Sequence, residues 1–426
     1  MGQASEFVRY LIEKSQSSPV EIYEKAKDCM CDYYAVTKAG AAANEKRWTE
    51  YLKYVGDGKV KIVGYDKYTD GKTAALINGF NAHSLELDDG QRFAMIHLGG
   101  SVISALYSAG MEGKIEKTDM LKGIVMGYEA ACRLSVSMQP SHKKCGFHTA
   151  GTCGTVGAAI AVGFALKMDD AKLERVLTAA IAGATGILEI QEQKSEMKPY
   201  NIGRAAMDGL TAAYMGFTDF KVPDDILNGE RGFMKLFSKE CNPEKMTEKT
   251  DYFEIERIYV KPYASCRHCH SAIEAALELR EQADIDNIEK IQVHTYHLAV
   301  KGHDHTEIAG TSSAKLSMPY SVAVALILGT ADVSAFKGEN ISREDIKALA
   351  AKVKIIENEE FTAVSSKKRV ARVDIFINNG KILSKQVDYA KGDPENPMSR
   401  KEIIAKAYSL LGDEAEEIVN KVYVFS

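Results

Sequence analysis

The run at residues 146–159 combines a histidine with glycines and hydroxyls in a way that suits proton transfer. It reads Gly-Phe-His-Thr-Ala-Gly-Thr-Cys-Gly-Thr-Val-Gly-Ala-Ala, so His148 precedes glycines spaced three apart. The apolar, alanine-rich residues up to Leu166 predict a buried helix, and the unpaired N–H groups at a helix start attract anions. A titratable imidazole beside a bound carboxylate is suited to acid–base catalysis. The alternative is a helix contact made of small residues with an incidental histidine.

A second block, residues 83–97, gathers charged side chains within fifteen positions. It holds His83, Glu86, Asp88, Asp89, Arg92 and His97. A solvated acidic helix end is the simplest alternative. The flanking residues are apolar and small, however, which favours burial of some of these charges. Because buried charges must be paired or shift their pKa values, this block is a candidate for function.

Two further blocks combine a lysine with a proline near a predicted helix start. Lys-Pro-Tyr-Asn-Ile-Gly-Arg-Ala-Ala begins at Lys198 and includes Arg204. We expect Lys198 to lie just before a helix that starts near Ile202, where its ammonium can meet a carboxylate. Lys-Leu-Ser-Met-Pro-Tyr-Ser, at residues 315–321, presents the phenol of Tyr320 at another helix start. The alternative for Lys198 is an ordinary surface lysine, and the alternative for residues 315–321 is a capped core helix without a catalytic role.

The block at residues 261–272 reads Lys-Pro-Tyr-Ala-Ser-Cys-Arg-His-Cys-His-Ser-Ala. Lys261 offers a point charge and Arg267 a planar fork for binding carboxylates. Cys266 and His268 are the neighbours of Arg267 in the sequence. The Cys266–Cys269 spacing resembles half of a zinc site. No second Cys/His pair stands at zinc-finger distance, so we expect no metal. The only later candidate ligands are His294, His297, His303 and His305.

The elements that must position these groups change character near residue 255. Before it, apolar periodicity predicts helices, including 5–15, 73–84, 100–109, 118–135, 170–188 and 202–214. After it, residues 288–297 alternate as a strand, and residues 370–388 read as a β-hairpin whose Asn-Gly turn needs positive φ at both central residues. Helices are expected between these strands at 271–282, 320–328 and 343–351, and again at 399–411 and 413–421.

Composition limits the class of protein. The 426 residues carry 54 basic and 59 acidic side chains, a formal net charge of −5, which argues against general nucleic-acid binding. The first ten residues contain Glu6 and lack a signal-peptide pattern, and no segment reads as a membrane span. Eight scattered cysteines fit a reducing compartment. We therefore expect a cytoplasmic protein with no nucleic-acid or membrane partner.

These blocks, in this order, resemble the MmgE/PrpD family, which includes 2-methylcitrate dehydratase, cis-aconitate decarboxylase and iminodisuccinate epimerase. The resemblance implies a mainly α, α+β protein: a large helical domain with an inserted smaller α+β lid. The implied boundaries are 1–260 for the helical domain, 261–392 for the lid and 393–426 for the helical return. It also implies a homodimer without cofactor or metal that acts on small di- or tricarboxylates.

The resemblance places family site positions on Glu86, with Asp88 and Asp89 adjacent, and on His97, His148, Lys198, Lys261 and Tyr320. We expect His148 to transfer protons, and Lys198 and Lys261 to stabilise enolate-like charge. Possible helpers are Arg92, Arg204 and Arg267, with Tyr320 as a proton donor or carboxylate ligand and Cys266 and His268 lining the pocket.

The leading hypothesis is a cofactor-independent lyase, either a hydro-lyase or a decarboxylase. An epimerase of an imino- or amino-dicarboxylate is the second, because family lyases often carry Asp-Asp-Thr-Trp and His-Pro where this chain has residues 88–92 and 97–99. A non-catalytic carboxylate-binding protein is the third.

Overall fold

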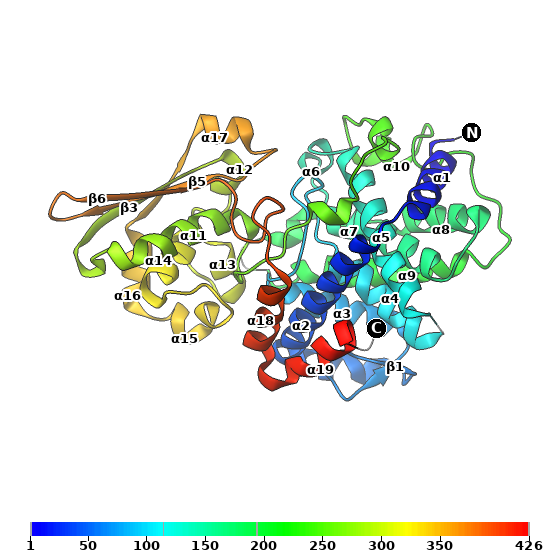
Figure 1. The fold of residues 1–426 in the computed structure, drawn as a ribbon, viewed down its shortest axis with the longest axis horizontal. Coiled ribbons are helices and arrows are strands. Elements are labelled where there is room, and N and C mark those ends of the chain that lie inside the picture. Colours follow the sequence, from blue (N-terminus) through cyan, green and yellow to red (C-terminus); the bar gives the residue numbers. More distant parts are fainter. Residues whose placement is uncertain (1, 114, 193–194, 425–426) are drawn as a thin grey trace.

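The computed structural model describes residues 2–113, 115–192 and 195–424, and it has two lobes (Figure 1). We call the larger the helical lobe and the smaller the lid lobe. The helical lobe comprises α1 (Gln3–Gln16), α2 (Val20–Tyr51), α3 (Gly71–Ser84), α4 (Gly99–Glu112), α5 (Lys117–Val136), α6 (Ser141–Lys144), α7 (Thr149–Ala165), α8 (Asp170–Gly183), α9 (Lys198–Met215), α10 (Phe233–Phe237), α18 (Arg400–Leu411) and α19 (Ala415–Val419). The predicted α+β class, mainly α, is confirmed.

Helix α7 lies at the centre of the helical lobe, and every one of its residues is buried. Its small side chains allow α5 to cross closely. A Cβ on Gly157 would lie 2.7 Å from the Ala131 Cβ and 2.8 Å from the Gly127 carbonyl oxygen. The three-residue glycine spacing therefore serves helix packing, and it also holds the start of α7, where His148 stands, at a fixed depth in the lobe.

The lid lobe is built on a four-stranded sheet in the order β4-β3-β5-β6. Strand β3 (Ile288–Thr295) pairs parallel with β4 (Val353–Glu357) and antiparallel with β5 (Ala371–Ile377), which pairs antiparallel with β6 (Ile382–Val387). Helix α11 packs on β5 and β6, and α14 packs on β4. The lid helices are α11 (His270–Leu279), α12 (His297–Val300), α13 (Thr311–Leu316), α14 (Met318–Leu328), α15 (Gly338–Ile341), α16 (Glu344–Ala351) and α17 (Glu359–Val364).

The β5–β6 connection differs from the expected two-residue turn. Gly380 has a φ of +85°, whereas Asn379 keeps a negative φ. The backbone N–H of Gly380 donates to the carbonyl oxygen of Ile377 at 2.8 Å. The loop is therefore longer, with one residue rather than two in the left-handed region, which glycine adopts without steric cost.

The chain returns to the helical lobe after the sheet, and α18 packs on α2 at the junction between the lobes (Figure 1). Lys406 of α18 lies 2.5 Å from the buried carboxylate of Asp32, and Arg400 pairs with Asp28 at the edge of the same contact. The helical core includes Ile403 and Ala407 from α18. This packing agrees with a helical return, and we keep 1–260, 261–392 and 393–426 as the proposed division.

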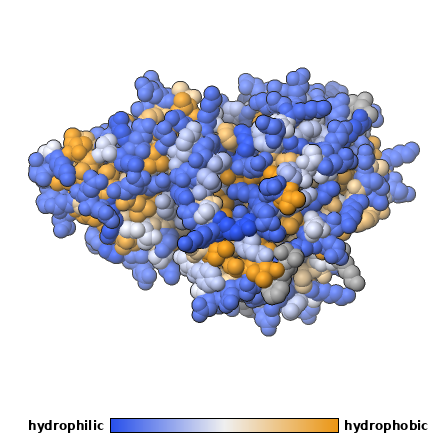
Figure 2. Space-filling model, in the orientation of Figure 1, coloured by the Kyte–Doolittle hydropathy of each residue, from blue (hydrophilic) through white to orange (hydrophobic). Residues whose placement is uncertain are grey.

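Within the helical lobe, a two-stranded ribbon joins β1 (Val60–Lys61) to β2 (Tyr68–Thr69), so this lobe is not wholly helical. The face shown in Figure 2 is mostly hydrophilic, with hydrophobic groups scattered between charged side chains. None of the helices formed by the described residues combines the length and apolar character that crossing a bilayer requires.

Candidate active site

Glu86 is the carboxylate on which the predicted site converges. Helix α3 ends at Ser84, and Glu86 two residues later has a φ of +52°, in the left-handed region that a residue with a side chain rarely adopts. This backbone turn directs the carboxylate inward, and Glu86 is only 8% exposed. Such a conformation costs about 1–2 kcal/mol, so the surrounding contacts must hold it.

Two lysines from distant segments bind the Glu86 carboxylate. Lys198, the first residue of α9, donates to Oε1 of Glu86, and Lys261 donates to Oε2 at 3.1 Å and to the backbone oxygen at 3.0 Å. Burial alone would raise the pKa of Glu86, but Lys198 and Lys261 lower it well below its usual range. Burial likewise opposes the charge of Lys261, yet Glu86 and Asp88 raise its pKa. The carboxylate and Lys261 are therefore both charged.

A third lysine, Lys315, enters the cluster from α13. Its Nζ donates to the backbone oxygen of Ser84 at 3.3 Å. Burial lowers the pKa of Lys315 to about 8, with Glu86 acting in the opposite direction and the charges of Lys261 and Lys198 lowering it further. Among the described residues no carboxylate lies within ion-pair distance of Lys315. The cluster thus holds one cation that is not neutralised.

Two imidazoles flank the lysines and share the Asp88 carboxylate. Nδ1 of His83 lies 2.8 Å from Oδ2 of Asp88, and Nδ1 of His97 lies 3.3 Å from the same oxygen. Burial would lower the pKa of His83, but Asp88 and Glu86 raise it. Burial dominates at His97 and lowers its pKa to about 4. Burial opposes the charge of Asp88, whereas His83 and His97 lower its pKa well below its usual range.

His148 stands at the N-cap position of α7, with its side chain buried. The side-chain amide of Asn201 lies 3.0 Å from Nδ1, and because an amide nitrogen can only donate, Nδ1 accepts and the proton is assigned to Nε2. Burial and the charge of Lys198 lower the pKa of His148 well below its usual value. The ring is therefore neutral and presents an N–H donor near Lys198.

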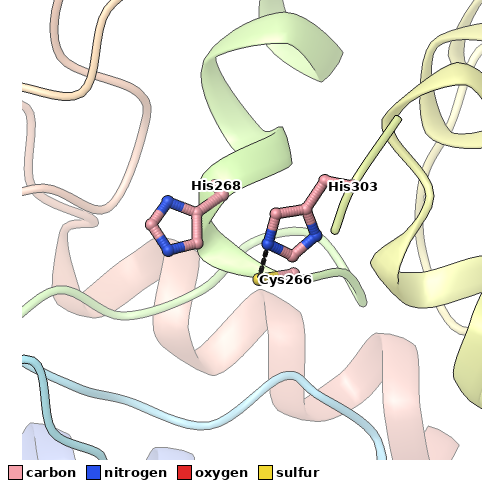
Figure 3. Close-up of side chains that lie close together, drawn as sticks. All are labelled: Cys266, His268 and His303. Atoms are coloured by element: carbon pink, nitrogen blue, oxygen red, sulfur yellow. Dashed lines mark hydrogen bonds between the residues drawn. The ribbon is translucent and has the colours of Figure 1, made fainter. Parts of the chain in front are cut away.

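Cys266 lies beside two histidines at the start of the lid lobe (Figure 3). Its Sγ is 3.8 Å from Nε2 of His303, and the ring of His268 lies on the other side of the sulfur. Burial would raise the pKa of the Cys266 thiol, but His303 outweighs burial and the pKa falls to about 6. The backbone N–H of Cys266 donates to the oxygen of Lys315 at 2.8 Å, which connects this group to the lysine cluster.

Two predicted catalytic residues have packing contacts instead. The hydroxyl of Tyr320 donates to the Ala335 carbonyl at 2.9 Å inside the lid core, and burial raises its pKa to about 12. Asp89 accepts from the Tyr128 hydroxyl at 2.6 Å and from the Gly99 N–H at 2.8 Å. Burial raises the pKa of Asp89 to about 7. We therefore assign Tyr320 to lid packing and Asp89 to fixing the loop before α4.

The three arginines expected to help bind substrate are also held in structural contacts. Arg92 binds Glu395 and lies 3.5 Å from Asp393, and Arg267 pairs with Asp393 at 2.8 Å. Arg204 binds Asp208 and the backbone oxygen of Gly151, the latter at 3.2 Å. The first two secure the chain where it leaves the lid, and the third braces the start of α7. Among the described residues, none of them forms a hydrogen bond or ion pair with Glu86 or with the lysines around it.

The sequence interpretation omitted three residues that the structure brings into the site. His83, Lys315 and Asn201 all lie inside the blocks that were singled out, but none was chosen. The signal for His83 was present, because a histidine three positions before Glu86 at a helix end is close enough to reach it. Lys315 carried no comparable signal, since only the lid packing brings it to Ser84.

The cluster is almost entirely buried. The side chains of His83 and Lys261 are fully buried, whereas those of Glu86 and Lys198 are 10% and 12% exposed. A surface cavity of about 370 Å³ lies elsewhere, lined by α2, the β1–β2 ribbon and α19, and contains none of the predicted site residues. Glu86 and Lys198 are therefore more accessible to solvent than His83 and Lys261.

Comparison with known proteins shows which family the chain belongs to. The MmgE/PrpD N-terminal domain model matches residues 5–246, and the MmgE/PrpD C-terminal domain model matches residues 263–422. The chain belongs to the MmgE/PrpD family. Cis-aconitate decarboxylase of Aspergillus terreus is 25% identical over 434 residues, which cover 94% of this chain and 87% of the fungal protein.

Two mammalian relatives are more distant. The cis-aconitate decarboxylases of Mus musculus and Homo sapiens are each 22% identical, over 78% of this chain and 70% and 71% of their own lengths. The family and these relatives support a lyase-type enzyme. At these identities the substrate must be argued from the site itself.

Proposed function

We propose that this protein is a cofactor-independent lyase that transfers a proton at a carbon next to a carboxylate, in a small di- or tricarboxylate. The observation that carries this proposal is the convergence of Lys198, Lys261 and Lys315 on the Glu86 region, beside neutral imidazoles. A buried group of cations with an unneutralised member is suited to a polyanionic ligand, because burial strengthens each charge interaction.

The lysines would stabilise the intermediate. Removing a proton or CO₂ next to a carboxylate leaves negative charge on an enolate-like oxygen, and fixed cations lower the energy of that state. Lys198 is the most accessible of the three, so we assign it first contact with a substrate carboxylate. Glu86 holds Lys198 and Lys261 in place, which avoids reorganisation when the charge develops.

Neutral imidazoles supply the proton transfer. Nδ1 of His97 lies 2.8 Å from the Asp89 carbonyl oxygen, and if it donates there Nε2 keeps a lone pair that can accept a proton. The low pKa keeps His97 neutral near pH 7. His148 presents an Nε2–H, which can donate to a carboxylate or to an enolate oxygen. We assign His97 as the base and His148 as the donor, with Asp88 and His83 orienting His97.

Decarboxylation and dehydration fit this arrangement, and the named relatives favour decarboxylation. The altered residues 90–99 had favoured an epimerase instead. In the structure, Arg92 from that stretch is bound to Glu395 rather than to Glu86, so its present contacts give no support to a different reaction. We retain epimerisation of an imino- or amino-dicarboxylate as the second candidate.

The decisive experiment is incubation of the purified protein in D₂O with cis-aconitate, citrate, 2-methylcitrate and iminodisuccinate, followed by NMR. We expect one acid to lose CO₂ or water and to gain deuterium next to a carboxylate. Deuterium incorporation with neither loss would establish an epimerase. The absence of both exchange and product, with ligand binding intact, would make the protein a carboxylate-binding protein and refute the proposal.

We also propose a cytoplasmic homodimer. All eight cysteines are free thiols, which supports a reducing compartment, and the resemblance to the family supports a dimer. Light scattering of the purified chain tests the dimer directly.

A further inference from the structure

We propose that Cys266, His268 and His303 form a binding site for one thiophilic divalent metal ion, of which Zn²⁺ is the best fit. Figure 3 shows the two imidazole rings on either side of the Cys266 sulfur. One ligand atom from each residue lies within 4.8 Å of the other two. Sequence spacing alone led us to expect no metal, and the proposal departs from that expectation because the fold brings His303 to Cys266 and His268. This site does not rest on the proposed lyase function, and no step of that reaction passes through it.

The spacing of the ligand atoms suits tetrahedral coordination. A zinc ion about 2.3 Å from sulfur and 2.0–2.1 Å from nitrogen places its ligand atoms about 3.3–3.6 Å apart. The distance from Sγ of Cys266 to Nε2 of His303 is 3.8 Å, so a shift of a few tenths of an ångström brings both to an ion. The centres of the two imidazole rings are 5.2 Å apart, which leaves room for the ion between them.

The second nitrogen of each histidine is already engaged, as metal-binding histidines require. Nδ1 of His303 lies 2.7 Å from the backbone oxygen of Leu316, which can only accept, so Nδ1 carries the proton and Nε2 has a free lone pair. Nδ1 of His268 lies 2.6 Å from the hydroxyl of Tyr296. With Nδ1–H donating to that oxygen, Nε2 of His268 is also available.

Three protein ligands leave a fourth position for water or another ligand, and the donor set indicates which ion binds. A thiolate with two imidazoles selects zinc and similar borderline or soft ions over Mg²⁺ and Ca²⁺, which prefer oxygen. All three residues are partly exposed, and the chain beside His303 is largely exposed, so an ion can enter. Cys269, the nearest cysteine in sequence, is buried in the lid core and takes no part.

The test measures binding without reference to activity. Full-length protein is stripped with a chelator, dialysed against Zn²⁺ in excess Mg²⁺, and analysed for bound metal. Co²⁺ is then used as a spectroscopic probe for a cobalt–thiolate bond. We expect about one ion per chain, a thiolate signal, and affinity at least about 100-fold weaker in Cys266→Ala and His303→Gln. Cys269→Ala, the matched control, should bind like the natural chain.

Tyr296→Phe keeps the shape of the lid and removes only the hydroxyl that orients His268. We expect it to weaken Zn²⁺ binding about 10-fold, within the range for loss of an outer hydrogen bond. Circular dichroism establishes that each variant is folded. Less than about 0.1 Zn²⁺ per folded chain, or unchanged affinity in folded Cys266→Ala, would overturn the proposal.

Discussion

Lys315 differs from the other two lysines of the site in what balances its charge. Lys198 and Lys261 share the Glu86 carboxylate, whereas Lys315 reaches only the Ser84 carbonyl oxygen among the described residues. An unneutralised buried ammonium is costly, and its pKa falls accordingly to about 8. A carboxylate ligand would supply the missing negative charge, so this lysine links substrate binding to pH.

We therefore expect kcat/KM to fall as the pH rises through about 8. Lys315 is protonated below its pKa and loses its charge above it, which removes attraction for an anionic substrate. Measuring kcat/KM from about pH 6 to 10 reports this ionisation in the free enzyme. Lys315→Arg keeps its charge over this range and should abolish the alkaline fall. The same fall in folded Lys315→Arg would assign it to another group.

The role of His148 can be tested against a histidine on the lid surface. We expect His148→Ala to fold normally and to lose at least about 100-fold in kcat, because general acid–base groups contribute typically 10²–10⁴-fold. His297→Ala is the control, since that side chain is 54% exposed and pairs with Glu357 on the lid surface. Steady-state rates on the true substrate decide the point. A kcat within about threefold of the natural chain would remove His148 from the mechanism.

The elements were predictable where their side-chain pattern is simple. Helices α5 and α9 and the β5–β6 hairpin follow from apolar periodicity and turn residues. The 32-residue helix α2 was not singled out, because its middle is buried on several sides and carries Asp32 within the core. Strand β4 was also missed, since it is a short edge strand whose position depends on parallel pairing with β3. Local pattern cannot report contacts of that kind.

The contact between α2 and α18 provides a test of element packing. In Lys406→Met, Asp32 would remain buried without its ammonium, and removing one partner of a buried pair costs about 3–5 kcal/mol. We expect that loss in the free energy of unfolding, measured by urea denaturation. Arg400→Ala on the same helix is the control: its side chain is 39% exposed, and such a pair contributes about 0–1 kcal/mol.

Replacing both partners, in Asp32→Asn with Lys406→Met, should recover part of the loss, because no buried charge is then left unpaired. Equal stabilities for Lys406→Met and Arg400→Ala would mean that this ion pair does not hold α18 on α2. Activity should also fall more in Lys406→Met than in Arg400→Ala. The reason is that Lys406 donates to the Leu87 carbonyl oxygen at 2.7 Å, and Leu87 is next to Asp88 of the candidate site.

At the scale of the whole molecule, the site is assembled from segments that are far apart in sequence. Glu86 follows the end of α3, Lys198 begins α9, Lys261 lies where the chain crosses between the lobes, and Lys315 belongs to the lid. The sequence motifs identified most of these residues, but the order of motifs along the chain does not give the distances between their side chains in the folded protein. For that reason Tyr320 and the three arginines were equally plausible from sequence, and only packing shows that the Tyr320 hydroxyl donates to a backbone oxygen and that each guanidinium is paired with a carboxylate.

Because the lysines come from both lobes, a bound substrate should stabilise the molecule as a unit. At a concentration of 100 times Kd, a ligand that binds only the folded state adds about 2.7 kcal/mol. We expect a single thermal transition that rises with substrate in the natural chain. The rise should be strongly reduced in Lys198→Ala, from the helical lobe, and equally in Lys315→Ala, from the lid. Lys301→Ala, an exposed lid lysine, is the matched control and should keep the full shift.

A shift that survives in Lys315→Ala but not in Lys198→Ala would mean that the substrate binds the helical lobe alone, and the lid would then lose its proposed part in recognition.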